Sequence, residues 1–200
     1  MRAGDNPFRA DRVQSLRYRF HDGDNWESML ARLQKCSFRA AIVGPEGVGK
    51  TTLHEELEAR LKEAGHPIRW LRLNRENRRQ APALIRRAFA DMTPKHLLFI
   101  DGAEQLGFWR WQLMKRRAGR LAGLVINTHT SGWLPTLIEC KSSVSLLSEV
   151  ADELLPEELR PPQEMLVSLF DRHAGNIRLC LRSLYDQWAS APDVSELSPH

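Results

Sequence analysis

The feature that most constrains this 200-residue chain is the octapeptide GPEGVGKT at residues 44–51. It has the form G-x-x-x-x-G-K-[ST], and it lies between the apolar run FRAAIVG and the stretch TTLHEELEARLKEAG, whose leucines recur at helical spacing. The apolar run predicts a buried strand, and the leucine spacing predicts a helix. Glycines let the backbone wrap an anion, and a helix start adds unpaired N–H donors. The stretch therefore predicts a strand, loop and helix that together bind phosphate groups.

Within this loop, each residue type has an expected task. Lys50 is expected to bridge the β- and γ-phosphates of a nucleoside triphosphate, and Thr51 to ligate Mg²⁺. Adenine is favoured over guanine because the chain has no N-K-x-D-type motif. The expected cofactors are therefore ATP and Mg²⁺, and the candidate nucleotide-binding residues are Gly44, Pro45, Glu46, Gly47, Val48, Gly49, Lys50, Thr51 and Thr52.

A second signal comes from the stretch HLLFID. Asp101 is the first charged residue after the apolar run 97–100, which predicts a buried strand that ends in a carboxylate. A carboxylate at the end of a strand beside the loop can hold magnesium through its water shell. We therefore expect Thr51 and Asp101 to form the metal site.

Strand and helix patterns alternate through the middle of the chain. Strands are expected at FRAAIVG, PIRWLRLN, HLLFID and GLVINTH, with LPTLIEC as a short fifth. This alternation predicts an α/β fold with three layers, in which a mainly parallel sheet is covered on both faces. After Cys140 the pattern becomes purely helical. The expected divisions are an N-terminal lead-in and helix at 1–37, the α/β domain at 38–140, a small C-terminal helical lid at 141–190 and a flexible tail at 191–200.

Two helices carry detailed expectations. The stretch DNWESMLARLQ predicts a helix opened by a capping box of Asp24 and Glu27. The stretch EQLGFWRWQLMKRRAG predicts a helix that buries Leu106, Trp109 and Leu113 and leaves Trp111 as the exposed anchor.

The loop AIVGPEGVGKTTL, the strands LLFIDGAEQL and GLVINTH, and the tail motif AGNIR together resemble the AAA+ class of ATPases, especially its compact origin-recognition and clamp-loader-like branches. The resemblance covers roughly residues 38–188. It implies a polar sensor at Asn127, with Thr128 as the alternative. It also implies that a glycine-x-x-arginine in the lid, Gly175 through Arg178, reaches the γ-phosphate.

The chain departs from that class at two points. Gly102 follows Asp101, where the class usually has a glutamate that polarises the attacking water. Glu104 is either a substitute general base or an acid that stabilises the start of the next helix. The stretch TSGWLPT also lacks the arginine that a neighbouring subunit would supply, unless Arg116, Arg117 or Arg120 serves instead. We therefore expect an ATP-dependent switch with weak or partner-stimulated hydrolysis.

Two alternatives stay open. One is a P-loop kinase that transfers the γ-phosphate to a small molecule or nucleotide, with its arginines as a clamp. The other is an ATP-gated module that binds nucleic acid through the basic region 69–120, since residues 69–128 hold 13 Lys and Arg against 4 Asp and Glu.

The sequence also raises expectations about partners and location. A protein partner is expected because a switch acts on another protein, and a homo-oligomer is compatible with the sequence. The apolar runs are too short for a membrane span, and the basic start lacks a secretory signal, so a cytoplasmic location is expected.

Overall fold

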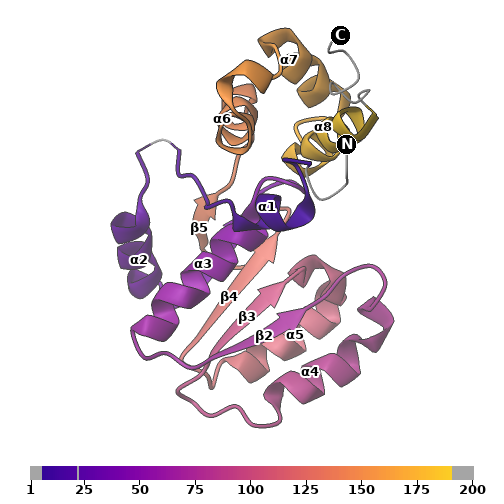
Figure 1. Cartoon of the computed structure of the whole chain (residues 1–200). Helices are drawn as coiled ribbons and strands as arrows, with labels where there is room; N and C mark the ends of the chain where they lie inside the picture. Colours follow the sequence, from indigo (N-terminus) through magenta and orange to yellow (C-terminus); the bar gives the residue numbers. More distant parts are fainter. Residues whose placement is uncertain (1–5, 22, 191–200) are drawn as a thin grey trace, which may run out of the picture. The chain divides into compact units, whose positions relative to one another are not determined.

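The computed structural model describes residues 6–21 and 23–190, so the tail predicted at 191–200 lies outside the described residues. The chain divides into two compact units: the first is Met1–Leu16, Glu46–Val48 and Lys141–His200, and the second is Arg17–Pro45 and Gly49–Cys140. The elements in chain order are α1 Ala10–Ser15, α2 Trp26–Lys35, β1 Arg39–Val43, α3 Lys50–Glu63, β2 Ile68–Arg72, η2 Arg78–Gln80, α4 Ala81–Phe89, β3 Leu97–Asp101, η3 Ala103–Leu106, α5 Gly107–Ala118, β4 Gly123–Thr128, β5 Thr136–Glu139, α6 Val144–Leu154, η4 Glu157–Leu159, α7 Gln163–Arg172 and α8 Ile177–Ser190 (Figure 1).

The second unit is built on a five-stranded sheet in the order β2-β3-β4-β1-β5. Every pairing in it is parallel. Parallel neighbours need a crossover connection, which α4 provides between β2 and β3 and α5 between β3 and β4. α3 connects β1 to β2, which are not adjacent in the sheet. The expected α/β class and parallel sheet are confirmed, and LPTLIEC does supply the fifth strand.

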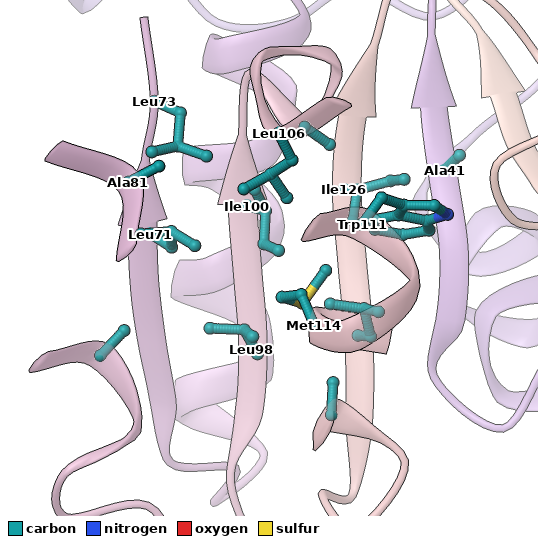
Figure 2. Packing of buried hydrophobic residues seen from close by; sticks show 14 of the residues in the cluster. Ala41, Leu71, Leu73, Ala81, Leu98, Ile100, Leu106, Trp111, Met114 and Ile126 are labelled. Atoms are coloured by element: carbon teal, nitrogen blue, oxygen red, sulfur yellow. The ribbon is translucent and has the colours of Figure 1, made fainter. Parts of the chain in front are cut away.

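Helices cover both faces of this sheet. Successive side chains of a strand point to opposite faces. On one face Leu98 and Ile100 of β3 pack with Trp111 and Met114 of α5 and with the buried alanines of α4 (Figure 2). On the other face Phe99 of the same strand stacks on the fully buried His54 of α3. The sheet therefore lies between helical layers.

The face that α5 buries differs from the prediction. Trp111 is buried, at 4% exposure, and its ring packs against that of Trp133 at 5.1 Å. Trp109 and Leu113 are exposed instead, at 82% and 70%. The predicted stripe counted from Leu106, but Leu106 belongs to the separate turn η3, and α5 starts at Gly107. Within α5 the inward positions are therefore 111, 114 and 118.

The start of α2 also differs from the prediction. Its N-cap is Asn25, whose side chain accepts from the Ser28 backbone while the Ser28 hydroxyl accepts from the Asn25 N–H. Asp24 instead pairs with Arg32, at 2.9 Å. The capping box lies one residue later than predicted because Asn accepts the cap bond as well as Asp does.

In the first unit, α6, α7 and α8 pack around a leucine-rich core. The N-terminal segment closes this core, since the ring of Phe8 lies 6.2 Å from that of Trp188. The Asn6 side-chain amide also donates to the Tyr185 carbonyl at 3.0 Å. In the part of the chain that the structure describes, no helix combines the length and the apolar character needed to cross a bilayer.

Candidate functional site

The glycine-rich loop, residues 44–51, connects the carboxyl end of β1 to the first turn of α3. Gly47 and Gly49 have φ values of +81° and +85°, in the left-handed region that favours glycine. Gly49 is the N-cap of α3, so the helix begins at Lys50. The first N–H groups of a helix have no partner within it, and they carry the positive end of its dipole. This loop has the chemistry of an anion site.

The ammonium group of Lys50 lies against the loop itself. Its Nζ donates to the carbonyl oxygens of Gly44 at 2.7 Å and Pro45 at 2.5 Å. The side chain therefore folds back from the helix start toward the beginning of the loop. A positive charge is thus held beside the backbone that the sequence assigns to phosphate binding.

Three predicted residues come together at the carboxyl ends of the strands. The Thr51 hydroxyl donates to Asp101 Oδ2 at 3.3 Å, and the Asn127 side-chain amide donates to Asp101 Oδ1 at 3.2 Å. The register explains the meeting, because Ile100 pairs with Ile126 and so places the next residue of each strand side by side. β4 also pairs with β1, which brings the loop after β1 to the same edge.

The donor set fits a hard divalent cation. Asn127 is 1% exposed, and among the described residues its Oδ1 has no hydrogen-bond partner. A buried polar atom without a partner is costly, so this oxygen suits a ligand or an ordered water. Beside it, the Asp101 carboxylate and the Thr51 hydroxyl, 3.3 Å apart, supply oxygens, the ligands that Mg²⁺ prefers.

Glu104 lies in η3, beside His129. Its Oε1 is 3.8 Å from His129 Nε2, and its Oε2 is buried without a partner among the described residues. It also occupies the first turn of η3, where an acid suits the helix dipole. This position is compatible with stabilisation of the helix start by Glu104, and its role as a general base stays a prediction.

Gly102 is required by the backbone. Its φ is +77°, and a Cβ built on it would lie 2.1 Å from the Leu73 carbonyl oxygen. That approach arises because the Leu73 N–H donates to the Asp101 carbonyl at 2.9 Å, which draws the chain after β2 against the end of β3. A glutamate directly after Asp101 would clash with the main chain.

Tyr18 was not predicted. A Cβ on Gly49 would lie 3.6 Å from the Tyr18 ring, and the Tyr18 hydroxyl donates to Cys140 Sγ at 3.4 Å. Burial, and then the neighbouring Cys140, raise the pKa of the Tyr18 hydroxyl, and burial raises the pKa of the Cys140 thiol. No sequence signal points to Tyr18, because the lead-in has no periodicity and the contact joins distant segments.

The other residues predicted for the site lie in the loop, in α3, in or just after α5, and in α8. Glu46, Gly47 and Val48 group with the first unit, and the rest of the loop groups with the second. Thr52 lies in the first turn of α3. Arg178 is exposed at the second position of α8, in the first unit, and the candidate substitute arginines are exposed at Arg116, Arg117 and Arg120.

Neither a scan against protein-family models nor a search of curated proteins gave a match to this chain.

Proposed function

We propose that this chain is an ATP-binding P-loop protein of the AAA+ kind, which acts as an ATP-dependent switch in the cytoplasm. The glycine-rich loop would hold the phosphates, with Lys50 between the β- and γ-phosphates. Thr51 and Asp101 would hold Mg²⁺, and Asn127 would sense the γ-phosphate. Bound Mg²⁺ would neutralise charge on the phosphates.

One observation carries this proposal. Asp101 accepts hydrogen bonds from both Thr51 and Asn127, at 3.3 and 3.2 Å, so a carboxylate, a hydroxyl and an amide from three separate segments share one point. The sequence and the resemblance to the AAA+ class predict a joint task in metal and phosphate binding for these residues. A chance glycine-rich turn would give no reason for them to meet.

Hydrolysis is proposed to be slow without a partner. Gly102 has no side chain to polarise water, and the backbone leaves no room for one. Glu104 lies beside His129, 3.8 Å away. Since a positioned general base contributes about 10²–10⁴-fold to rate, a site in which neither residue acts as one would leave bound ATP long-lived, which suits a switch. The resemblance to the AAA+ class adds Arg178 as the proposed γ-phosphate contact from the lid.

Calorimetry with Mg·ATP tests the proposal. Wild type is expected to bind, and Lys50→Ala to lose binding because the ammonium beside the loop is gone. Lys62→Ala is the matched control, since this lysine is in the same helix, is about half exposed and pairs with Glu58 at 2.7 Å. Mg·GTP should bind more weakly than Mg·ATP.

Two results would count against the proposal. Unchanged affinity in Lys50→Ala would remove the loop from nucleotide binding. Basal ATP turnover above roughly 1 s⁻¹ in the purified protein, within the range of efficient enzymes, would contradict the slow switch.

A further inference from the structure

The outward side of α5 exposes large apolar side chains of the types that folded proteins usually bury. Trp109 is 82% exposed, Leu113 70% and Phe108 64%. Trp109, Leu113 and Arg116 recur at i, i+4 and i+7, so they lie along one stripe of the helix. We call this stripe, with Phe108 beside it, the outer face of α5. Clustered exposed apolar side chains of this size mark interaction sites.

The outer face changes character along the helix. Trp109 and Leu113 occupy its first half, and the cations Lys115, Arg116 and Arg117 occupy its last turn. At about 1.5 Å per residue, Trp109 and Arg116 lie roughly 10 Å apart along the axis. A partner must therefore offer apolar groups next to negative charge within about two turns of helix.

The cations continue beyond α5. The helices η2, α4 and α5 contain no Asp or Glu. In the structure as described, residues 6–21 and 23–190, none of their basic side chains forms an ion pair with a carboxylate. Arg117 lies over the Phe89 ring at 4.6 Å, so basic side chains also bridge α4 and α5. The exposed set is Arg78, Arg79, Arg86, Arg87, Arg110, Lys115, Arg116, Arg117 and Arg120.

The shape of the apolar part decides between two kinds of anionic partner. A nucleic-acid strand needs flat aromatic faces on which successive bases stack. The rings of Phe108 and Trp109 meet edge to face, 79° apart with centroids at 5.3 Å, and Leu113 adds a branched aliphatic group. That surface suits apolar side chains, and tryptophan beside arginine is the pairing found at the energetic centres of protein interfaces.

We propose that the outer face of α5 is the docking site for an acidic amphipathic helix of a partner protein. Leucine-like side chains one turn apart on that helix would pack on Trp109 and Leu113. Its carboxylates would pair with Arg116 and Arg117, which favour bidentate contacts. The outer face of α5 contains none of the candidate nucleotide-binding residues 44–52, so this proposal does not rest on the proposed function.

The test measures the binding of a fluorescein-labelled synthetic peptide to the 200-residue chain by anisotropy, without nucleotide. The peptide is helical, with leucines at i, i+4 and i+7 and glutamates along one flank, and a scrambled peptide of the same composition is the reference. We expect the helical peptide to bind at least about tenfold tighter than the scrambled one. Trp109→Ala should weaken binding roughly tenfold or more. Arg116→Glu should weaken it and flatten its salt dependence.

Matched controls separate docking from folding and from general charge. Leu179→Ala removes a 40% exposed leucine of α8, and Arg172→Glu reverses an exposed arginine of α7, so both should leave peptide affinity unchanged. All four variants alter exposed side chains, and each should keep the wild-type melting temperature. Equal binding of the two peptides, or full affinity in Trp109→Ala, would overturn the proposal. Tighter binding of oligothymidylate that depends on Trp109 would assign the face to nucleic acid and overturn it as well.

Discussion

Replacing Gly102 with alanine tests whether the backbone itself excludes a side chain after Asp101. Its φ of +77° is left-handed, a conformation that costs an L-residue about 1–2 kcal/mol. The new Cβ would also lie 2.1 Å from the Leu73 carbonyl oxygen, and relieving such an overlap by moving main chain costs about 1–3 kcal/mol. The free energy of unfolding should therefore fall by about 2–5 kcal/mol.

Gly65→Ala is the matched control for this substitution. Gly65 has a similar φ of +86°, but a Cβ there meets nothing within 4 Å. It should lose only the conformational part, about 1–2 kcal/mol. Urea unfolding of wild type and both variants, followed by far-UV circular dichroism, measures how much each variant lowers the free energy of unfolding. The comparison requires that all three proteins have the same dependence of this free energy on urea concentration.

The difference between the two variants isolates the overlap with Leu73. If Gly102→Ala costs no more than Gly65→Ala, the close approach of the two strand ends is not rigid and the reasoning fails. The same overlap applies to Gly102→Glu. That variant should therefore be destabilised and should not gain ATP turnover, although it introduces the residue type that the AAA+ class usually carries.

Three further predictions concern the proposed metal site, a buried core histidine and the C-terminal helical lid. In Asp101→Asn, the increase in ATP affinity on adding Mg²⁺ should be about 10–100-fold smaller than in wild type. Calorimetry with Mg²⁺ and with EDTA measures this increase. An increase as large as that of wild type would show that Asp101 does not hold the metal. His54 is fully buried against Trp70 and Phe99, and burial, then Arg72, lowers its pKa to about 3. The unfolded chain takes up this proton below pH 6.5 and the folded chain does not, so stability should fall by up to about 1.4 kcal/mol per pH unit between pH 6.5 and 3. His54→Leu should flatten urea midpoints across that window, and an unchanged slope would contradict this assignment. Arg178→Ala should leave ATP affinity nearly unchanged but abolish any difference in protease resistance between the ATP- and ADP-bound protein, and a persisting difference would exclude the proposed γ-phosphate contact.

The sequence predicted the secondary structure around the glycine-rich loop and Asp101 correctly. The strand before the glycine-rich loop, the helix after it and the buried run that ends at Asp101 each follow from residues adjacent in the chain. Their periodicity and apolar character are local properties, and the structure has all three. The order of the strands is set by long-range pairing, so the meeting of Asp101 and Asn127 had no local signal.

The errors have a common physical origin. The prediction for α5 failed because it treated η3 and α5 as one continuous helix. Since α5 begins separately at Gly107, its buried face includes Trp111 in place of Trp109. The shift of the α2 cap from Asp24 to Asn25 is a similar displacement by one residue. Tyr18 was missed because its neighbours Gly49 and Cys140 come from other parts of the chain.

The sheet order has a consequence for how the chain folds as it is made. Both neighbours of β1 come later in the sequence: β4 begins at residue 123, 80 positions after β1 ends at residue 43, and β5 follows it. When synthesis has reached residue 100, the chain therefore contains β1 without either of its ladder partners. Such distant pairing slows folding and leaves apolar strands open to aggregation. The nascent chain thus acquires its glycine-rich loop long before it has the strands that would hold that loop in shape.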